Sequence, residues 1–267
     1  YDYFMPRAAA EWGISMRYCF REKLEEGGRL LGTMVTTFAS ADLPKILARC
    51  GFDFFVVDCE HGSFTTREVA DMLAVARAIG LPGVVRIPEL RREHVLKFLE
   101  MGAEGLLLPN TESAEQAQQL VDWAKYAPVG HRGVSLNRPH TDFEKVDGRT
   151  YMEQSNRGTV LMAQIESREG VEHVAEIMAV DGIDLALIGP NDMSQDYGLL
   201  GQYTHPEMEA AFAKVVAGAQ ASGKRAGGHF SGAAALKPWL DRGMTVNMWN
   251  SDLGMLKAGS AGMAELR

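Results

Sequence analysis

The sequence has few cysteines, no excess of basic residues and no long hydrophobic run. Three cysteines, Cys19, Cys50 and Cys59, occur in 267 residues without the spacing of a zinc site. A sparse, odd set favours reduced thiols and a cytoplasmic protein. Acidic residues outnumber basic ones by 35 to 27, and the net charge of −8 disfavours binding to nucleic acid or to a membrane surface. No window holds the roughly 18 apolar residues of a membrane span, and the first residues lack a signal-peptide pattern.

Two further absences concern cofactor and mechanism. No G-x-G-x-x-G motif follows the first predicted strand, which disfavours an open sheet that binds a dinucleotide. No lysine follows a central predicted strand at the expected depth, which disfavours Schiff-base chemistry. The composition, 46% hydrophobic and 23% charged, is typical of a globular protein with a full core.

Short apolar runs alternate with helical patterns along the chain, as in parallel strands covered on both faces. Eight strand-then-helix units predict an α/β fold, a (β/α)8 TIM barrel, with an open doubly wound sheet as the alternative. We expect one domain over 1–267, with an N-terminal extension and helix in 1–28 and a C-terminal helix in 250–267 packed on or exchanged with a neighbouring subunit. Expected strands are 31–37, 53–58, 83–87, 104–108, 159–165, 183–188, 225–230 and 244–249. Expected helices are 40–50, 66–79, 91–101, 113–125, 168–179, 206–222, 232–242 and 252–265, with an extra helix at 15–26 across the bottom of the barrel.

Local signals refine these boundaries. Ser113 and Gln116 form a capping-box pattern, and Ser40 is the expected N-cap of the helix at 40–50. Residues 127–158 are expected to form a long irregular loop, and long loops in compact domains tend to be functional.

Polar residues directly follow the predicted strands, at the end where barrel enzymes place their active sites. They are Asp58, Glu60, His61, Arg86, Asn110, Gln164, Glu166, Asn191 and Asp192. Charged groups facing the barrel axis need partners, so the set indicates either a site or an ion-pair network.

Glu166 and Asp192 follow adjacent strands and are the candidate metal ligands. Two carboxylates without cysteine or histidine suit Mg²⁺ or Mn²⁺ better than structural zinc. The alternatives are an acid at a helix N-terminus for Glu166 and a helix cap for Asp192.

Arg86 and His61 are the candidate groups for charge stabilisation and proton transfer. A guanidinium at a strand end can hold a carboxylate or an enolate oxygen, or instead form a salt bridge to Glu60 or Asp58. An imidazole suits proton transfer near neutral pH, although a lone histidine is more often structural. Cys59 has no activating base next to it in the sequence and is interpreted as a packing thiol.

Six segments occur in the order FDFFVVDCEHGSF, GVVRIPE, MGAEGLLLPN, HRGVS, QIESREGVEH and LIGPNDMSQDYG. Together, over about residues 20–260, they resemble the HpcH/HpaI family of class II, metal-dependent 2-oxo acid aldolases. The resemblance implies a lyase that makes or cleaves 4-hydroxy-2-oxo acids from pyruvate and an aldehyde through a pyruvate enolate. It also implies a bound divalent metal (Mg²⁺ or Mn²⁺, with Co²⁺ as a further option) and a homohexamer, a trimer of dimers that exchange the last helix.

The resemblance also assigns roles to residues. It implies that Glu166 and Asp192 bind the metal, that Arg86 stabilises the enolate and that His61 is the base of the proton relay. It places Gln164 near the oxo acid, and Pro190, Asn191 and Asp192 in the substrate site. Glu100 stands where some members carry an Asp that supports the histidine from a neighbouring subunit.

Two strand ends depart from the family pattern. His229 replaces an aliphatic residue common in related aldolases, and Trp249, Asn250 and Ser251 lie near the expected mouth. Both places help to form the aldehyde pocket in the family, so we expect a larger and more polar lining here. The competing functions are a citrate-lyase-like enzyme acting on acyl-CoA and a non-catalytic barrel that binds a 2-oxo acid.

Overall fold

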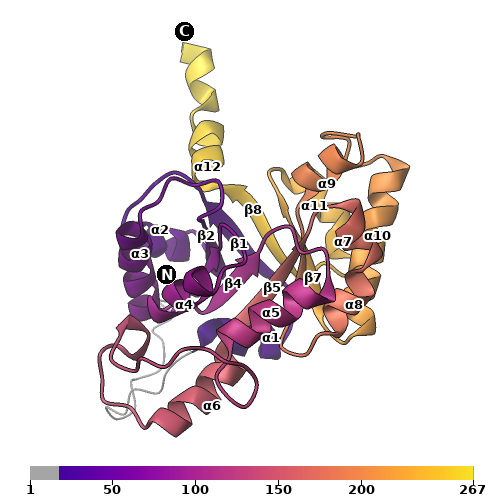
Figure 1. Cartoon of the computed structure of the whole chain (residues 1–267). Helices are drawn as coiled ribbons and strands as arrows, with labels where there is room; N and C mark the ends of the chain where they lie inside the picture. Colours follow the sequence, from indigo (N-terminus) through magenta and orange to yellow (C-terminus); the bar gives the residue numbers. More distant parts are fainter. Residues whose placement is uncertain (1–17, 267) are drawn as a thin grey trace.

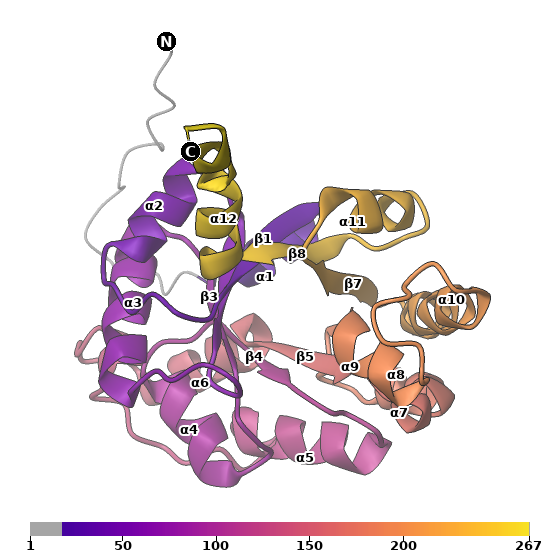
Figure 2. The same ribbon diagram turned by 90° about the horizontal axis from the view of Figure 1, so that it is seen from above.

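The computed structural model describes residues 18–266 of the chain. Eight parallel strands form a closed barrel in which each strand pairs with the next and β8 pairs with β1 (Figures 1 and 2). The strands are β1 (Leu30–Val35), β2 (Phe54–Asp58), β3 (Gly83–Arg86), β4 (Gly105–Leu108), β5 (Val160–Ile165), β6 (Leu185–Ile188), β7 (Arg225–Phe230) and β8 (Val246–Ser251). The predicted (β/α)8 barrel is confirmed, and the alternative of an open sheet is wrong.

Helices surround the barrel, as the view from above shows (Figure 2). Their bounds are α1 (Cys19–Glu26), α2 (Leu43–Arg49), α3 (Thr66–Ile79), α4 (Arg92–Glu100), α5 (Ala114–Ala124), α6 (Gly148–Gly158), α7 (Arg168–Glu172), α8 (Val174–Ala179), α9 (Pro190–Asp196), α10 (Pro206–Ala221), α11 (Ala233–Leu240) and α12 (Asp252–Gly259). Two 3₁₀ segments complete the set, η1 (Pro139–Thr141) and η2 (Ala261–Leu266).

Several predicted boundaries need correction. The helix expected at 40–50 begins later, because Ser40 Oγ accepts from the backbone N–H of Asp42 instead of capping the helix. The helix expected at 168–179 is divided into α7 and α8 at His173. The region 127–158 is not wholly irregular, since α6 begins where the Asp147 carboxylate accepts from a backbone N–H in its first turn. The capping box of Ser113 is confirmed.

Side chains along each strand alternate between the barrel axis and the surrounding helices. One buried apolar cluster fills the axis and includes Leu30, Phe54, Val56, Val84, Met162, Leu187 and Met248. A second lies between the strands and the helices and includes Val57, Val85, Ile87, Ile165, Ile188 and Phe230. This alternation decides which strand-end residues face the axis.

Helix α1 closes the N-terminal end of the barrel, as the sequence predicts. Phe20 packs into the axial cluster with its ring centroid 4.9 Å from that of Phe54. The backbone N–H of Phe20 donates to the buried Glu104 carboxylate at 2.8 Å. The predicted start of this helix, at residues 15–17, lies outside the described residues.

Helix α12 leaves the barrel and projects away from it (Figure 1). At its first residue, Asp252 accepts hydrogen bonds at 2.7–3.0 Å from the backbone N–H groups of Thr36, Thr37 and Phe38. These bonds tie the segment after β1 to the end of β8, where the barrel closes.

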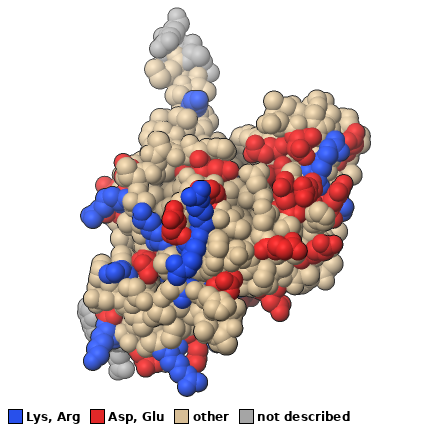
Figure 3. Space-filling model, in the orientation of Figure 1, with Lys and Arg blue, Asp and Glu red and all other residues tan. Residues whose placement is uncertain are grey.

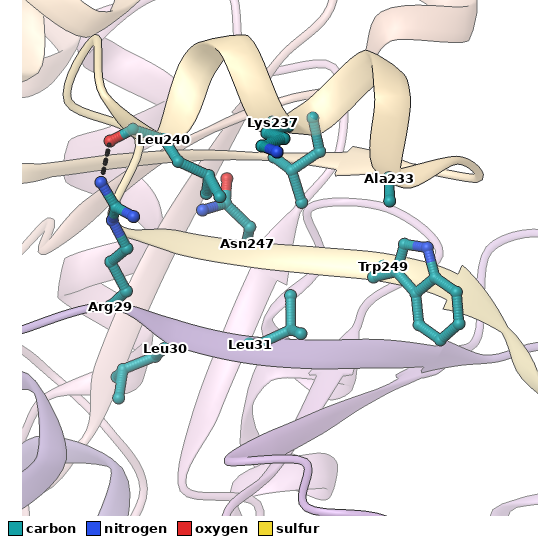
Figure 4. A pocket seen from close by; sticks show the side chains of 9 residues that line it. Arg29, Leu30, Leu31, Ala233, Lys237, Leu240, Asn247 and Trp249 are labelled. Atoms are coloured by element: carbon teal, nitrogen blue, oxygen red, sulfur yellow. Dashed lines mark hydrogen bonds between the residues drawn. The ribbon is translucent and has the colours of Figure 1, made fainter.

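An apolar cavity of about 520 Å³ lies outside the junction of β1 and β8, beside α11 (Figure 4). Leu31, Leu236, Leu240 and Trp249 contribute to its lining. The cavity lies on the outer face of these strands, and α12 does not cover it.

Charge is unevenly spread on the face drawn in Figure 3. Asp and Glu side chains gather over α7, α9 and α10, whereas Lys and Arg lie mainly on the opposite side of that face. Among residues 18–266, no helix combines the length and the apolar character that crossing a bilayer requires.

Candidate active site

Polar side chains replace apolar ones on the axial face at the C-terminal end of the barrel. The alternation that points apolar residues of β2, β3 and β5 to the axis continues to Asp58, Arg86, Gln164 and Glu166. These four are 2%, 6%, 4% and 3% exposed. Burying charge is costly unless it is partnered, so this end of the barrel is the candidate active site.

Arg86 and Asp58 form a bidentate ion pair across β3 and β2. Nε donates to Oδ1 at 2.9 Å and Nη2 donates to Oδ2 at 2.7 Å. Burial alone would raise the pKa of Asp58, but the Arg86 guanidinium and two backbone N–H groups outweigh it and hold the pKa below its usual value. The salt bridge considered for Arg86 is therefore present, and it fixes the guanidinium at the mouth.

Glu60 links this pair to His61. Its Oε2 lies 3.0 Å from Nη1 of Arg86 and 3.9 Å from Nε2 of His61. Burial raises the pKa of Glu60, although Arg86 opposes the rise. The His61 side chain is 67% exposed, so its imidazole can exchange protons with solvent while it remains beside the buried charges.

Glu166 is a buried carboxylate that forms no ion pair with any residue of 18–266. Oε1 accepts from the backbone N–H of Asn110 at 2.7 Å, and Oε2 accepts from the side-chain amide of Gln164. Burial, together with the charges of Asp192 and Glu60, raises the pKa of Glu166 to about 7, although the hydrogen bonds from Asn110 and Gln164 oppose the rise. The other amide atom, Gln164 Oε1, is buried and has no hydrogen-bond partner within residues 18–266.

The start of α9 brings the remaining predicted residues to the same rim. Pro190 is buried at the first helical position, and the exposed Asn191 and Asp192 follow it. Asn191 Oδ1 accepts from the Tyr203 hydroxyl. The charge of Asp192 contributes to the raised pKa values of both Glu60 and Glu166.

Gly189, just before α9, is a site residue that the sequence analysis missed. A Cβ at this position would lie 2.2 Å from Glu166 Oε2 and 2.8 Å from Gln164 Nε2. Only glycine lets these groups approach the backbone so closely. The available signal was the Gly-Pro pair between an apolar strand and the acidic residues that follow it.

Glu100 does not join this group within the chain. It is the last residue of α4, and the segment after it pairs with the beginning of β3, where Glu104 N donates to Gly83 O at 2.9 Å. It therefore lies toward the N-terminal end of the barrel, whereas Arg86 lies at the C-terminal end of β3.

His229 on β7 and Trp249 on β8, which differ from the family pattern, point to opposite faces of the barrel wall. Trp249 faces outward and lines the cavity beside α11 (Figure 4). Its ring stacks on that of Phe52 with a centroid distance of 6.4 Å. Its expected place at the mouth is therefore wrong. His229 is partly buried and donates from Nε2 to Asn250 O at 2.8 Å. Burial raises the pKa of Cys59 to about 12, in agreement with a packing thiol.

Comparison with known proteins agrees with this geometry. The family described as HpcH/HpaI aldolase/citrate lyase matches residues 34–257. The chain belongs to this family. A crystal structure of an HpcH/HpaI aldolase from Desulfitobacterium hafniense is 36% identical, with a TM-score of 0.89 over 92% of this chain and 95% of that one.

The similar curated members of the HpcH/HpaI family are aldolases. The hydroxypyruvate/pyruvate aldolase of Roseobacter denitrificans is 32% identical over 89% of this chain and 92% of its own length. The 5-keto-4-deoxy-D-glucarate aldolase of Klebsiella pneumoniae is 33% identical over 83% and 86%. The CitE protein of Mycobacterium tuberculosis, crystallised with magnesium and acetate, is 17% identical over 85% and 87%, has a TM-score of 0.54 and shows the fold alone. The chain is thus an enzyme of the lyase class, and the aldolase function is better supported than the citrate-lyase one.

Proposed function

We propose that the enzyme makes or cleaves 4-hydroxy-2-oxo acids by forming the enolate of pyruvate and adding it to an aldehyde. The observation that carries this proposal is the pairing, at one strand-end site, of a fixed guanidinium with a buried carboxylate that has no ion-pair partner in the described part of the chain. The first suits an enolate oxygen, and the second suits a metal ion. Neither group is needed to fill the barrel, because the layers below them are apolar.

The residues present fit a divalent cation held by Glu166 and Asp192. Among the described residues, Glu166 has only neutral donors within hydrogen-bond distance. Gln164 Oε1, which has no hydrogen-bond partner among them, adds an oxygen close to it. No three His, Cys, Asp or Glu side chains gather as a metal site among the described residues, so two carboxylates are the protein ligands of this proposal. Oxygen ligands favour Mg²⁺ or Mn²⁺, with Co²⁺ as a further option, and such an ion would act as a Lewis acid toward the keto acid.

Arg86 offsets the negative charge of the enolate. A guanidinium has five N–H donors, and three of its nitrogen–oxygen contacts here are made to Asp58 and Glu60. Donors therefore remain for a substrate oxygen, and the ion pair holds them in place before the reaction. His61, exposed at the rim, transfers protons between the substrate and solvent. Gln164, Pro190, Asn191 and Asp192 form the rest of the substrate wall.

Deuterium loss from methyl-labelled pyruvate tests this function, with and without Mg²⁺ or Mn²⁺. We expect exchange that requires the ion and that is abolished by Glu166→Gln. The exposed Glu169→Gln, on the same segment, is the matched control and should retain exchange. Exchange that persists in Glu166→Gln would discard the assignment. Binding of pyruvate without any exchange would instead support the non-catalytic alternative.

The uncovered β1–β8 cavity supports an assembly in which α12 of another subunit covers it. Leu256 and Met263 at the end of the chain are 59% and 55% exposed. Exposed apolar residues on α12 and η2, together with an apolar cavity on the same molecule, favour exchange between copies. We infer a homo-oligomer, with a hexamer as the expected size, and light scattering of the wild type and Leu256→Asp measures it. A wild-type monomer would contradict this inference.

A further inference from the structure

His229 has a fixed tautomer set by a backbone carbonyl. A carbonyl oxygen only accepts hydrogen bonds, so the 2.8 Å contact between Nε2 and Asn250 O requires the proton on Nε2. Burial lowers the pKa of His229, which keeps the ring neutral near pH 7. Nδ1 is then an unprotonated acceptor, and it has no hydrogen-bond partner within the described chain.

The direction of the side chain follows from the alternation along β7. Phe230 points to the helices, where its ring lies 6.1 Å from that of Phe212. A Cβ at Gly228 would contact Phe230, so that position faces the same way. His229, between them, therefore faces the barrel axis. Its pairing with Met248 of the axial cluster agrees, so His229 lies on the same axial face, at the C-terminal end of the barrel, as Arg86 and Asp58.

Pyruvate does not satisfy this acceptor. It contains a methyl, a keto and a carboxylate group, and none of these donates a hydrogen bond. A hydroxyl group does, and a neutral imidazole nitrogen is a good acceptor for it. An aliphatic residue at position 229 would offer no acceptor for a hydroxyl group.

We propose that His229 accepts a hydrogen bond at Nδ1 from a hydroxyl group next to the carbonyl of one substrate, and so selects hydroxylated over deoxy substrates. The proposal rests on the aldolase function above and adds its substrate class. The hydroxyl group belongs either to a 2-hydroxyaldehyde acceptor or to a 3-hydroxy-2-oxo acid donor. His229 acts as a specificity residue, and Asn250 acts through it by fixing the tautomer.

Two pairs of compounds of equal size show in a kinetic assay whether the hydroxyl group belongs to the aldehyde or to the oxo acid. Glycolaldehyde and propanal differ by one hydroxyl-for-methyl exchange, as do hydroxypyruvate and its methyl analogue 2-oxobutanoate. We compare the kcat/KM ratio within each pair, with pyruvate as the donor for the aldehydes and propanal as the acceptor for the oxo acids. Comparing the ratio between variants cancels the intrinsic reactivity of each compound.

Two variants separate the Nε2 donor of His229 from its Nδ1 acceptor. His229→Gln retains a donor that can reach Asn250 O but lacks the Nδ1 acceptor, whereas His229→Asn retains an acceptor near Nδ1 but lacks that donor. We expect His229→Gln to lower the hydroxyl preference about tenfold in one pair, as the loss of one hydrogen bond predicts, and His229→Asn to keep most of it. An unchanged ratio in both pairs, or an equal loss on both members of each pair, would overturn the proposal.

A measurement on the wild type does not depend on how the variants fold. In ¹⁵N spectra of the histidines, we expect one unprotonated Nδ1 resonance to shift on binding the hydroxylated compound and not its methyl analogue. A protonated Nδ1, or the same shift with both compounds, would overturn the proposal. If the aldolase function itself were wrong, no pyruvate exchange and no aldol product would form with any aldehyde, which distinguishes the two failures.

Discussion

Glu104 makes stability depend on pH in a direction opposite to that of most carboxylates. It is 2% exposed beneath α1, and burial raises its pKa from 4.5 to about 7 despite the bond from Phe20 N. The unfolded chain therefore loses this proton at lower pH than the folded chain does. The free energy of unfolding then falls as pH rises from about 4.5 to 7.

Glu104→Gln removes the charge and keeps an oxygen that can accept from Phe20. A pKa difference of about 2.5 corresponds to about 3 kcal/mol, because each pKa unit is worth about 1.4 kcal/mol. We expect the variant to be more stable than the wild type by about 3 kcal/mol at pH 8 and by less than about 1 kcal/mol at pH 5.

Urea unfolding at both pH values, at one protein concentration, measures the difference. Glu25→Gln, an exposed residue on the same α1, is the control and should change little at either pH. A difference between Glu104→Gln and the wild type that is the same at pH 5 and pH 8 would refute the argument from burial.

Three further predictions concern the mouth. Gly189→Ala should lower pyruvate exchange about a hundredfold in a folded protein, because the new Cβ displaces Glu166. Asp58→Asn should cost about 3–5 kcal/mol in urea unfolding, since it leaves the buried Arg86 guanidinium without its main partner. Asp252→Ala should cost about 2–3 kcal/mol near pH 7. Burial opposes ionisation of Asp252, but its hydrogen bonds hold the pKa below the usual value, so this cost should shrink below about pH 4.

Each of these three substitutions has a control variant or an outcome that would contradict its explanation. Gly232→Ala adds a methyl group at a position with no heavy atom within 4 Å, and exchange should persist. Equal exchange in Gly189→Ala and Gly232→Ala would contradict the close-approach argument. A change below about 1 kcal/mol for Asp58→Asn would show that Glu60 alone compensates the guanidinium. An Asp252→Ala cost that is as large at pH 3 as at pH 7 would remove the ionised carboxylate as its cause.

The sequence predicted the barrel and most of the site because both depend on local order. The apolar runs identify the eight strands. The residue after each run lies at the mouth regardless of the conformation of the loop that follows. Contacts between distant segments were not predictable in this way. The bidentate geometry of Arg86 and Asp58, the close approach at Gly189 and the outward turn of Trp249 depend on strand register and side-chain direction. The position of Glu100 relative to another subunit stays a prediction.

The carboxylate of Asp252 has a mechanical consequence. It is the first residue of the helix that projects from the barrel, and it holds three consecutive backbone N–H groups of the loop beside the mouth. A displacement of α12 would therefore act directly on that loop, as well as on the strands β1 and β8 that the helix contacts. If another subunit held α12, that contact would also influence the position of the loop beside the mouth.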